Sequence, residues 1–322
     1  MTYTSGSTIV AADYNGFVND TAGANVNGIW ATGTTDAGYG QTAISTVSAA
    51  GSITATQWAS LVNNLASLGS HQGTAITSRS APVAGNTINI LAALNTDLTN
   101  CTTNRGNAAA SGSQYTGWTG TNSKTTSTTG AFTITFTNTV TFSSAAAARY
   151  FWNAGGLVKI QVGKSATGQT GDPEWNDLAT TLCGAIFISG RVNSAAQTIA
   201  GVSYSGTKQV GGTGTPATLA SNTGWYQLTA GGAATIVYKQ FADSSPYTSN
   251  YIQHTLAKGA GSDSLVISTT WVNAEGDTIS GGTAASGATV GTAPCTIVTY
   301  YPPSSTYLTA AWGTPSVAAT TA

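Results

Sequence analysis

Apolar side chains recur at helical spacing in the first hundred residues, most clearly in ITATQWASLVN (53–63). Thr54 and Gln57 match the T-x-x-Q capping box, and Ile53 is placed to pack on Trp58 as a hydrophobic staple. One helical face then carries Trp58, Leu61, Val62, Leu65 and Leu68. The pattern predicts a helix over 54–68, with Gly69 as its natural end.

The same pattern occurs earlier in IVAADYNGFVN (9–19), where Tyr14 matches Trp58 and Phe17 matches Leu61. A weaker third copy is VAGNTINILAA (83–93). We therefore expect further helices at 10–27 and 86–103. These helices form a small bundle or lie along a partner. Either arrangement makes structural or interface residues of Tyr14, Phe17, Trp58, Leu61 and Leu65.

Residues 104–130 are rich in Gly, Ser and Thr and show no apolar period. This composition predicts a linker or long loop between the helical segment (1–103) and the rest of the chain.

From residue 131 onwards the spacing changes to alternation. In AFTITFTNTVTF (131–142) five apolar residues lie on alternate positions with threonine between most of them, which is typical of a half-buried strand or hairpin; they are Phe132, Ile134, Phe136, Val140 and Phe142. Val158, Ile160 and Val162 alternate in the same way. Further strands are expected at about 184–192, 223–229, 234–241, 249–257, 264–273 and 294–301.

One helix interrupts these strands at GDPEWNDLATTL (171–182), where Trp175, Leu178 and Leu182 share a face. The expected fold class is α+β, mainly β. Short N-terminal helices precede an antiparallel β-sandwich over 131–322, with one or two small helices laid on it.

Charged residues are scarce, and their scarcity argues against some classes of function. The chain has 10 Lys and Arg against 11 Asp and Glu, so charged residues make up 7% of it, compared with about 25% in soluble domains. The basic residues are scattered, so no basic stripe for nucleic acid is expected. A nearly neutral surface suits a subunit held in an assembly. We also expect no secretory signal and no membrane span.

The acidic residues form two small groups. Asp172, Glu174 and Asp177 fall in the first turn of the predicted helix, where carboxylates cap free N–H groups. Glu275 and Asp277 lie in a turn-like segment, with a weak calcium site as the alternative. A glycan-degrading enzyme using Asp172, Glu174 or Asp277 is the catalytic alternative.

We expect no catalytic residue, cofactor or metal. His71 and His254 lie far apart in sequence, and no hydrolase or zinc motif is present. Cys101, Cys183 and Cys295 are widely spaced and predict separate small core or interface residues.

The stretch AAAARYFWNAGGLVKI (145–160) places Arg149, Tyr150, Phe151 and Trp152 side by side. Ser143 or Ser144 can cap a short helix over the alanine run, and Gly155–Gly156 can end it. We expect Phe151 to anchor the core, with Tyr150 and Trp152 on adjoining faces. Arg149 should bind a backbone carbonyl or a carboxylate.

This stretch resembles the ARYFFNAGG element of structural proteins from tailed bacteriophage virions, especially those of marine myoviruses. The segments VAADYNGFVNDTAGANVNGIW, GYGQTAI, ITATQWASLVNNLASLGSHQGT and TIVTYYPPSST are similar to the same group. The resemblance implies a non-enzymatic subunit of the tail, neck, baseplate or fibre, located in the virion after assembly in the host cytoplasm.

Its implied partners are copies of itself, with a trimer among the options, and other virion proteins. Neither nucleic acid nor membrane is expected as a partner. The alternative is a receptor- or glycan-binding adhesin, or a head-surface decoration protein, of the same particle. Eight Trp and thirteen Tyr motivate the glycan-binding option, because exposed aromatic rings can stack on sugars.

Overall fold

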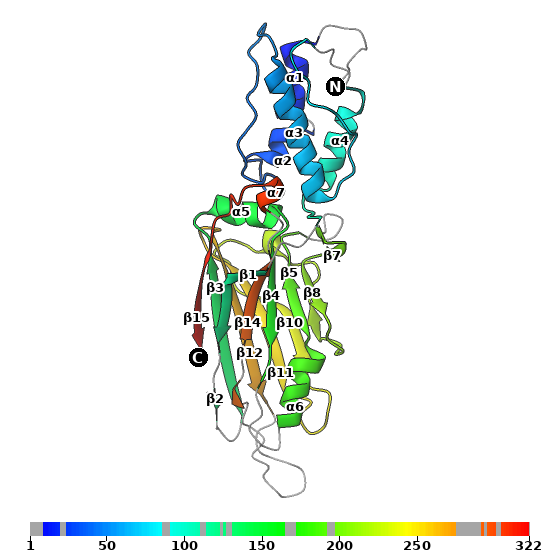
Figure 1. Ribbon diagram of the computed structural model, residues 1–322. Coiled ribbons are helices and arrows are strands. Elements are labelled where there is room, and N and C mark those ends of the chain that lie inside the picture. Colours follow the sequence, from blue (N-terminus) through cyan, green and yellow to red (C-terminus); the bar gives the residue numbers. More distant parts are fainter. Residues whose placement is uncertain are drawn as a thin grey trace, which may run out of the picture.

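The computed structural model describes residues 9–19, 24–85, 91–109, 114–122, 125–126, 131–164, 172–191, 197–274, 291–292, 295–300 and 304–321. Figure 1 shows an elongated molecule with a helical body at one end and a longer β body at the other. The C-terminal strand runs along the side of the β body.

The helical body contains α1 (Ala11–Asn19), α2 (Val26–Trp30), α3 (Ala55–Gln72) and α4 (Leu91–Thr103). The predicted capping box is present, because the Thr54 side chain accepts from the Gln57 backbone and the Gln57 side chain accepts from the Thr54 backbone. The rings of Tyr14 and Trp58 meet edge to face at 5.3 Å. The apolar stripes of α1 and α3 therefore pack against each other, as in the predicted bundle.

Two helix boundaries differ from the prediction. Helix α3 continues through Gly69 and ends at Gln72, and Gly73, with its positive φ of 65°, provides the left-handed cap. A single helix over 10–27 is wrong, because Asn25 is extended and caps a new helix by accepting from Gly28 N at 2.7 Å. Residues 86–90 of the third predicted helix lie outside the described residues.

The β body contains two antiparallel sheets. The five-stranded sheet has the order β1-β14-β4-β5-β8, and the six-stranded sheet has the order β15-β3-β12-β11-β10-β9. In the first sheet the strands are β1 (Gln114–Asn122), β14 (Cys295–Tyr300), β4 (Leu157–Val162), β5 (Ala185–Ile188) and β8 (Thr207–Val210). In the second they are β15 (Ser316–Thr321), β3 (Phe132–Thr141), β12 (Ser264–Asn273), β11 (Tyr251–Lys258), β10 (Thr235–Phe241) and β9 (Thr218–Leu219). Two short ladders join β13 (Gly291–Thr292) to β2 (Thr125–Thr126) and β6 (Gln197–Ile199) to β7 (Val202–Tyr204).

Strand β3 shows how the alternating sequence forms this sheet. Its residues Ile134, Phe136 and Val140 are buried, and the threonines between them are more exposed. These side chains belong to the same hydrophobic cluster as Ile160 and Ile186 from the five-stranded sheet. The α+β, mainly β class is confirmed, while the finer description as a β-sandwich stays a prediction.

Three other expectations need correction. Residues 104–130 are not wholly a linker, because β1 lies in this stretch and pairs with β14. The strand predicted at 223–229 is a 3₁₀ turn, Trp225–Gln227, whose backbone N–H groups at Trp225 and Tyr226 bond to Ser189 and Gly190. The predicted helix at 171–182 is present as α6 (Asp172–Asn176), which continues as a π-helical turn, Asp177–Leu182.

The C-terminal part of the chain returns to the helical body before it forms strand β15. After α7 (Ser304–Tyr307) the backbone of Thr309 donates to Gln41 Oε1 at 2.8 Å and accepts from Gln41 Nε2 at 2.9 Å. Leu308 and Trp312 are buried beside this contact. The predicted 131–322 domain therefore contributes part of its own chain to the helical body.

Candidate functional site at the junction of the two bodies

Helix α5 (Ala145–Asn153) lies where the two bodies meet, and its sequence explains its limits. Ser144 caps it by accepting from Ala147 N at 3.1 Å. Gly155 follows the helix with a φ of 92°, which favours glycine. A Cβ atom on Gly156 would lie 2.5 Å from the Phe151 ring, so the glycine pair also makes room for that ring.

Arg149 extends from α5 to the loop of residues 32–38 in the helical body. Its guanidinium donates to the carbonyl oxygens of Thr32 at 2.7 Å and Ala37 at 3.0 Å. The prediction that Arg149 binds a backbone carbonyl or a carboxylate is confirmed, and the partner lies in the same chain. Charged donors to backbone oxygens make strong hydrogen bonds, so Arg149 holds this loop against α5.

Asn153, at the end of α5, makes a second link between the bodies. Its amide nitrogen donates to Gly38 O at 3.0 Å, and its amide oxygen accepts from the Tyr226 hydroxyl at 2.5 Å. Burial raises the pKa of the Tyr226 phenol above its ordinary value, so this hydroxyl stays a donor. One buried amide thus binds both the helical body and the β body.

Three charged side chains complete the junction. Oδ2 of Asp36 lies 2.8 Å from Arg105 Nη2 and 2.7 Å from Arg191 Nη1. Arg191 is only 3% exposed, and its burial lowers the guanidinium pKa, an effect that nearby Asp36 opposes. We call Asp36, Arg105, Arg149, Asn153, Arg191 and Tyr226 the junction cluster.

Helix α3 joins the same region through its last turn. His71 Nε2 lies 3.1 Å from Ala154 O, and Gln72 donates to the Tyr39 hydroxyl at 2.9 Å. That hydroxyl donates in turn to Arg105 O at 2.7 Å. Burial lowers the pKa of His71 to about 4, so the imidazole is neutral near pH 7.

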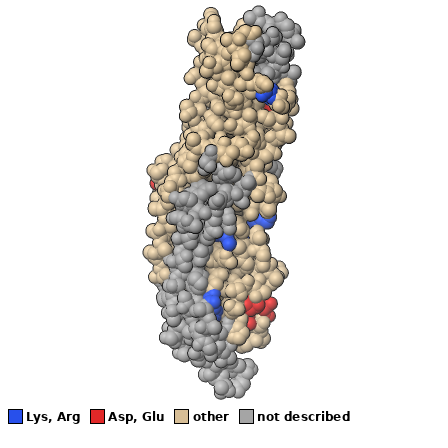
Figure 2. All heavy atoms as spheres, viewed as in Figure 1, with Lys and Arg blue, Asp and Glu red and all other residues tan. Residues whose placement is uncertain are grey.

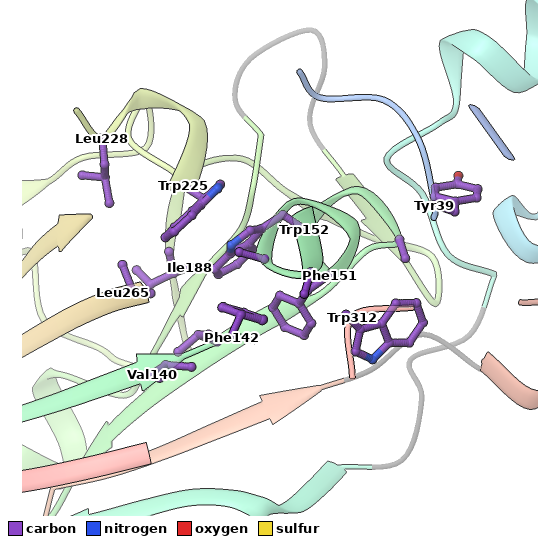
Figure 3. Packing of buried hydrophobic residues seen from close by; sticks show 14 of the residues in the cluster. Tyr39, Val140, Phe142, Phe151, Trp152, Ile188, Trp225, Leu228, Leu265 and Trp312 are labelled. Carbon is purple, nitrogen blue, oxygen red and sulfur yellow. The ribbon is translucent and has the colours of Figure 1, made fainter. Parts of the chain in front are cut away.

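A row of aromatic rings extends from α5 into the β body (Figure 3). Phe151 lies 5.3 Å from Phe142 and 4.9 Å from Trp152, measured between ring centroids. Trp152 stacks on Trp225 at 5.6 Å, and the Lys258 ammonium lies 4.5 Å from the Trp225 centroid. Phe151 is fully buried, so its expected role as a core anchor is confirmed.

Most of the other residues singled out from the sequence lie in the core and not at an exposed site. Tyr14, Phe17, Trp58, Leu61 and Leu65 are buried inside the helical body. Trp175 is buried in the β body, 5.6 Å from Trp271 between ring centroids. Among these residues and the four side chains of 149–152, only Arg149 and Tyr150 are partly exposed. The others are therefore structural residues of this chain.

No strong sequence signal marks Asp36, Arg105 or Arg191, because each stands alone in a different segment. The glycines of the GYG stretch are the one local clue. Gly40 has a φ of 74°, and a Cβ atom there would lie 2.5 Å from the Tyr150 ring. Such a close approach of a loop to a helix requires glycine.

The suspected chemical groups have ordinary structural surroundings where they are described. Burial raises the pKa values of Cys101 and Cys183 to about 12, and both are free thiols. Burial also raises the pKa of Glu174. Among the described residues no group of three His, Cys, Asp or Glu is placed to bind a metal ion. Glu275 and Asp277 and the side chains of Asp172 and Cys295 lie outside the described set.

Within the described ranges, no helix combines sufficient length with sufficient hydropathy to cross a bilayer.

Comparison with known proteins gives no relative. No family model matches the chain, and neither a curated protein nor a solved structure matches it.

Proposed function

We propose that the protein is a non-enzymatic structural subunit of a tailed-bacteriophage virion. The observation that carries this proposal is the junction, where the stretches that resemble virion proteins meet in space. Arg149 and Asn153 of ARYFWNAGG bond to the carbonyls of Ala37 and Gly38 at the start of the GYG loop. His71, from the ITATQW stretch, lies against Ala154. Parts of three of the resembling stretches therefore contribute contacts that join the two bodies.

The chemistry of the junction also supports a structural role. The Arg149 guanidinium binds backbone carbonyls, and Arg105 and Arg191 share one carboxylate. These charged groups are engaged in holding two parts of one chain together.

Charge on the surface points the same way. Figure 2 shows small, separated groups of basic and acidic atoms on an otherwise uncharged face, outside the grey regions. Weak mutual repulsion between copies suits a protein that is packed against its neighbours. The virion proposal thus combines a sequence resemblance with a surface suited to assembly.

The glycan-binding alternative loses most of its tryptophans among the described residues. It relied on exposed aromatic rings, and of those rings Trp30 is partly exposed and Tyr307 is exposed, while the following are buried: Trp58, Trp152, Trp175, Trp225, Trp271 and Trp312. Buried indoles stabilise the fold and offer no face to a sugar.

The proposal is tested by quantitative mass spectrometry of phage particles purified by density-gradient centrifugation from an infected culture. We expect this chain at a constant ratio to the major particle proteins through successive purification steps. The unpurified lysate serves as the reference for loosely bound protein. A chain that is abundant in the lysate but lost from the purified particles would falsify the proposal.

A further inference from the structure

The outward side of the six-stranded sheet has an unusual surface, which we call the threonine face. On β3 every outward residue from Thr133 to Thr141 is threonine. The outward residues of β12 run from Ser264 to Val272, and those of β11 run from Tyr251 to Ala257. Apart from Thr133, which is exposed, all of them are partly buried, in alternation with buried side chains.

Strand register places these short side chains in rows across the sheet. Thr135 lies opposite Thr270, and their hydroxyl oxygens are 3.4 Å apart. Thr137 lies opposite Ser268, with 3.3 Å between the hydroxyls. Neighbouring hydroxyls therefore bond to each other along the surface. The rows present methyl groups and satisfied hydroxyls to whatever lies above them.

Charge is scarce on the threonine face. In the described part of β3, β12, β11 and β10, its one charged residue is Lys239, which pairs with Gln253 of β11 and Thr218 of β9. The Lys239 ammonium is 3.7 Å from the ring centroid of Tyr251 and 4.5 Å from that of Phe241. The outward side of the other sheet carries Lys159 and Lys208 in one row with Phe187. The two sheets therefore differ in how they meet solvent.

This composition lowers the cost of association. Burying a long charged side chain removes up to about 2 kcal/mol of rotamer entropy, whereas short side chains lose much less. The threonine face also has almost no charge to desolvate. A face of this kind can be covered by a protein at small cost.

The size of the face fits a stable contact between two proteins. Strands β15, β3, β12, β11 and β10 at roughly 4.8 Å spacing, with roughly 3.3 Å per residue, give a footprint of about 650 Å². Two such faces would bury about 1,300 Å² in total, which lies within the range of about 1,200–2,000 Å² for specific interfaces.

We propose that the threonine face binds the threonine face of a second copy of this chain, around a twofold axis. A surface with a single charged residue repels its own copy only weakly. A twofold interface uses the same patch on both subunits, so one such surface can serve as both halves of the contact. The inference rests on the proposed function as an assembling subunit and adds which surface assembles.

The test measures the mass of the protein in solution by light scattering coupled to size-exclusion chromatography. The double variant Thr139→Arg/Thr255→Arg places two positive charges near the centre of the threonine face. In a twofold contact these charges would lie close to the same charges of the second copy and repel them. We expect its mass to fall to half that of the wild type at equal concentration. The matched control Gln161→Arg changes an exposed residue on β4 of the other sheet, and it should keep the wild-type mass.

A second measurement covers the case in which the double variant does not fold. Thr255→Cys, treated with a short bismaleimide, should form a covalent dimer, whereas Gln161→Cys should not. A wild-type protein with the mass of one chain, or an oligomer that survives the double variant, overturns the inference. Either result can coexist with incorporation into particles, so this inference can fail while the proposed function stands.

Discussion

Replacing Phe151 with alanine should remove a large part of the stability of the junction. The ring is fully buried and contacts Phe142 and Trp152, with Gly156 directly beneath it. Losing the burial of a phenylalanine costs about 1.5–3 kcal/mol. The cavity left among rigid neighbours brings the total for such a change to about 3–5 kcal/mol. We expect a loss near 4 kcal/mol because two aromatic contacts disappear together.

Urea unfolding followed by tryptophan fluorescence and far-ultraviolet circular dichroism measures this loss as a shift in midpoint at an unchanged slope. Phe187→Ala is the matched control. That ring is only partly buried, and its centroid lies 5.4 Å from the centroid of the Tyr204 ring. Its removal should therefore cost about 1 kcal/mol.

A variant too unstable to purify would still leave the argument testable. Phe151→Leu keeps most of the volume and should cost less than about 1.5 kcal/mol. The reasoning is refuted if the free energy of unfolding of Phe151→Ala lies within about 1 kcal/mol of the wild-type value, which is roughly the effect expected at a partly exposed ring.

Three further changes probe the contacts of Arg149, His71 and Gly40 at the junction. Arg149→Lys should cost about 2 kcal/mol, because one ammonium cannot replace the guanidinium bonds to two carbonyls, and hydrogen exchange should quicken in the loop it binds. Burial lowers the pKa of His71 to about 4 from about 6.5, so the unfolded chain binds the extra proton and stability should fall as the pH drops from about 6.5 to 4. His71→Gln should flatten that pH profile, leaving the slope contributed by His254, whose pKa burial lowers to about 3. Gly40→Ala should lower the melting temperature more than Gly85→Ala, because both have positive φ but only Gly40 lies against a ring.

The sequence predicted those elements in which a local pattern and the tertiary contacts agree. The capping box at Thr54 and Gln57 fixes the start of α3, and the alternation in β3 separates its buried and outward faces. Gly69 was a poor stop signal, because the glycine serves a close approach of the chain: a Cβ atom there would lie 3.0 Å from Thr74 O and 3.2 Å from the Ile76 side chain.

The errors have physical causes as well. The segment around Trp225 alternates like a strand, yet it forms a 3₁₀ turn. Trp225 and Leu228 lie three positions apart and are both buried, which fits the turn and not the alternation of a strand. The polar residues of β1 suit a loop and a strand equally, so only pairing with β14 decides between them. Asp36 and Arg191 are 155 positions apart in the chain, and no local pattern could bring them together.

The contact between Gln41 and Thr309 also has a consequence for biosynthesis. The two residues are separated by 268 positions, so the joint lacks Thr309 until the ribosome has added that many residues after Gln41. At roughly 5–20 residues per second, that interval is on the order of ten to fifty seconds. During this time the helices can fold, but Gln41 lacks its bonds to Thr309 and Trp312 has not yet been added. A nascent chain that stops before Thr309 therefore leaves apolar side chains exposed at the joint, and chaperones and proteases can recognise such side chains.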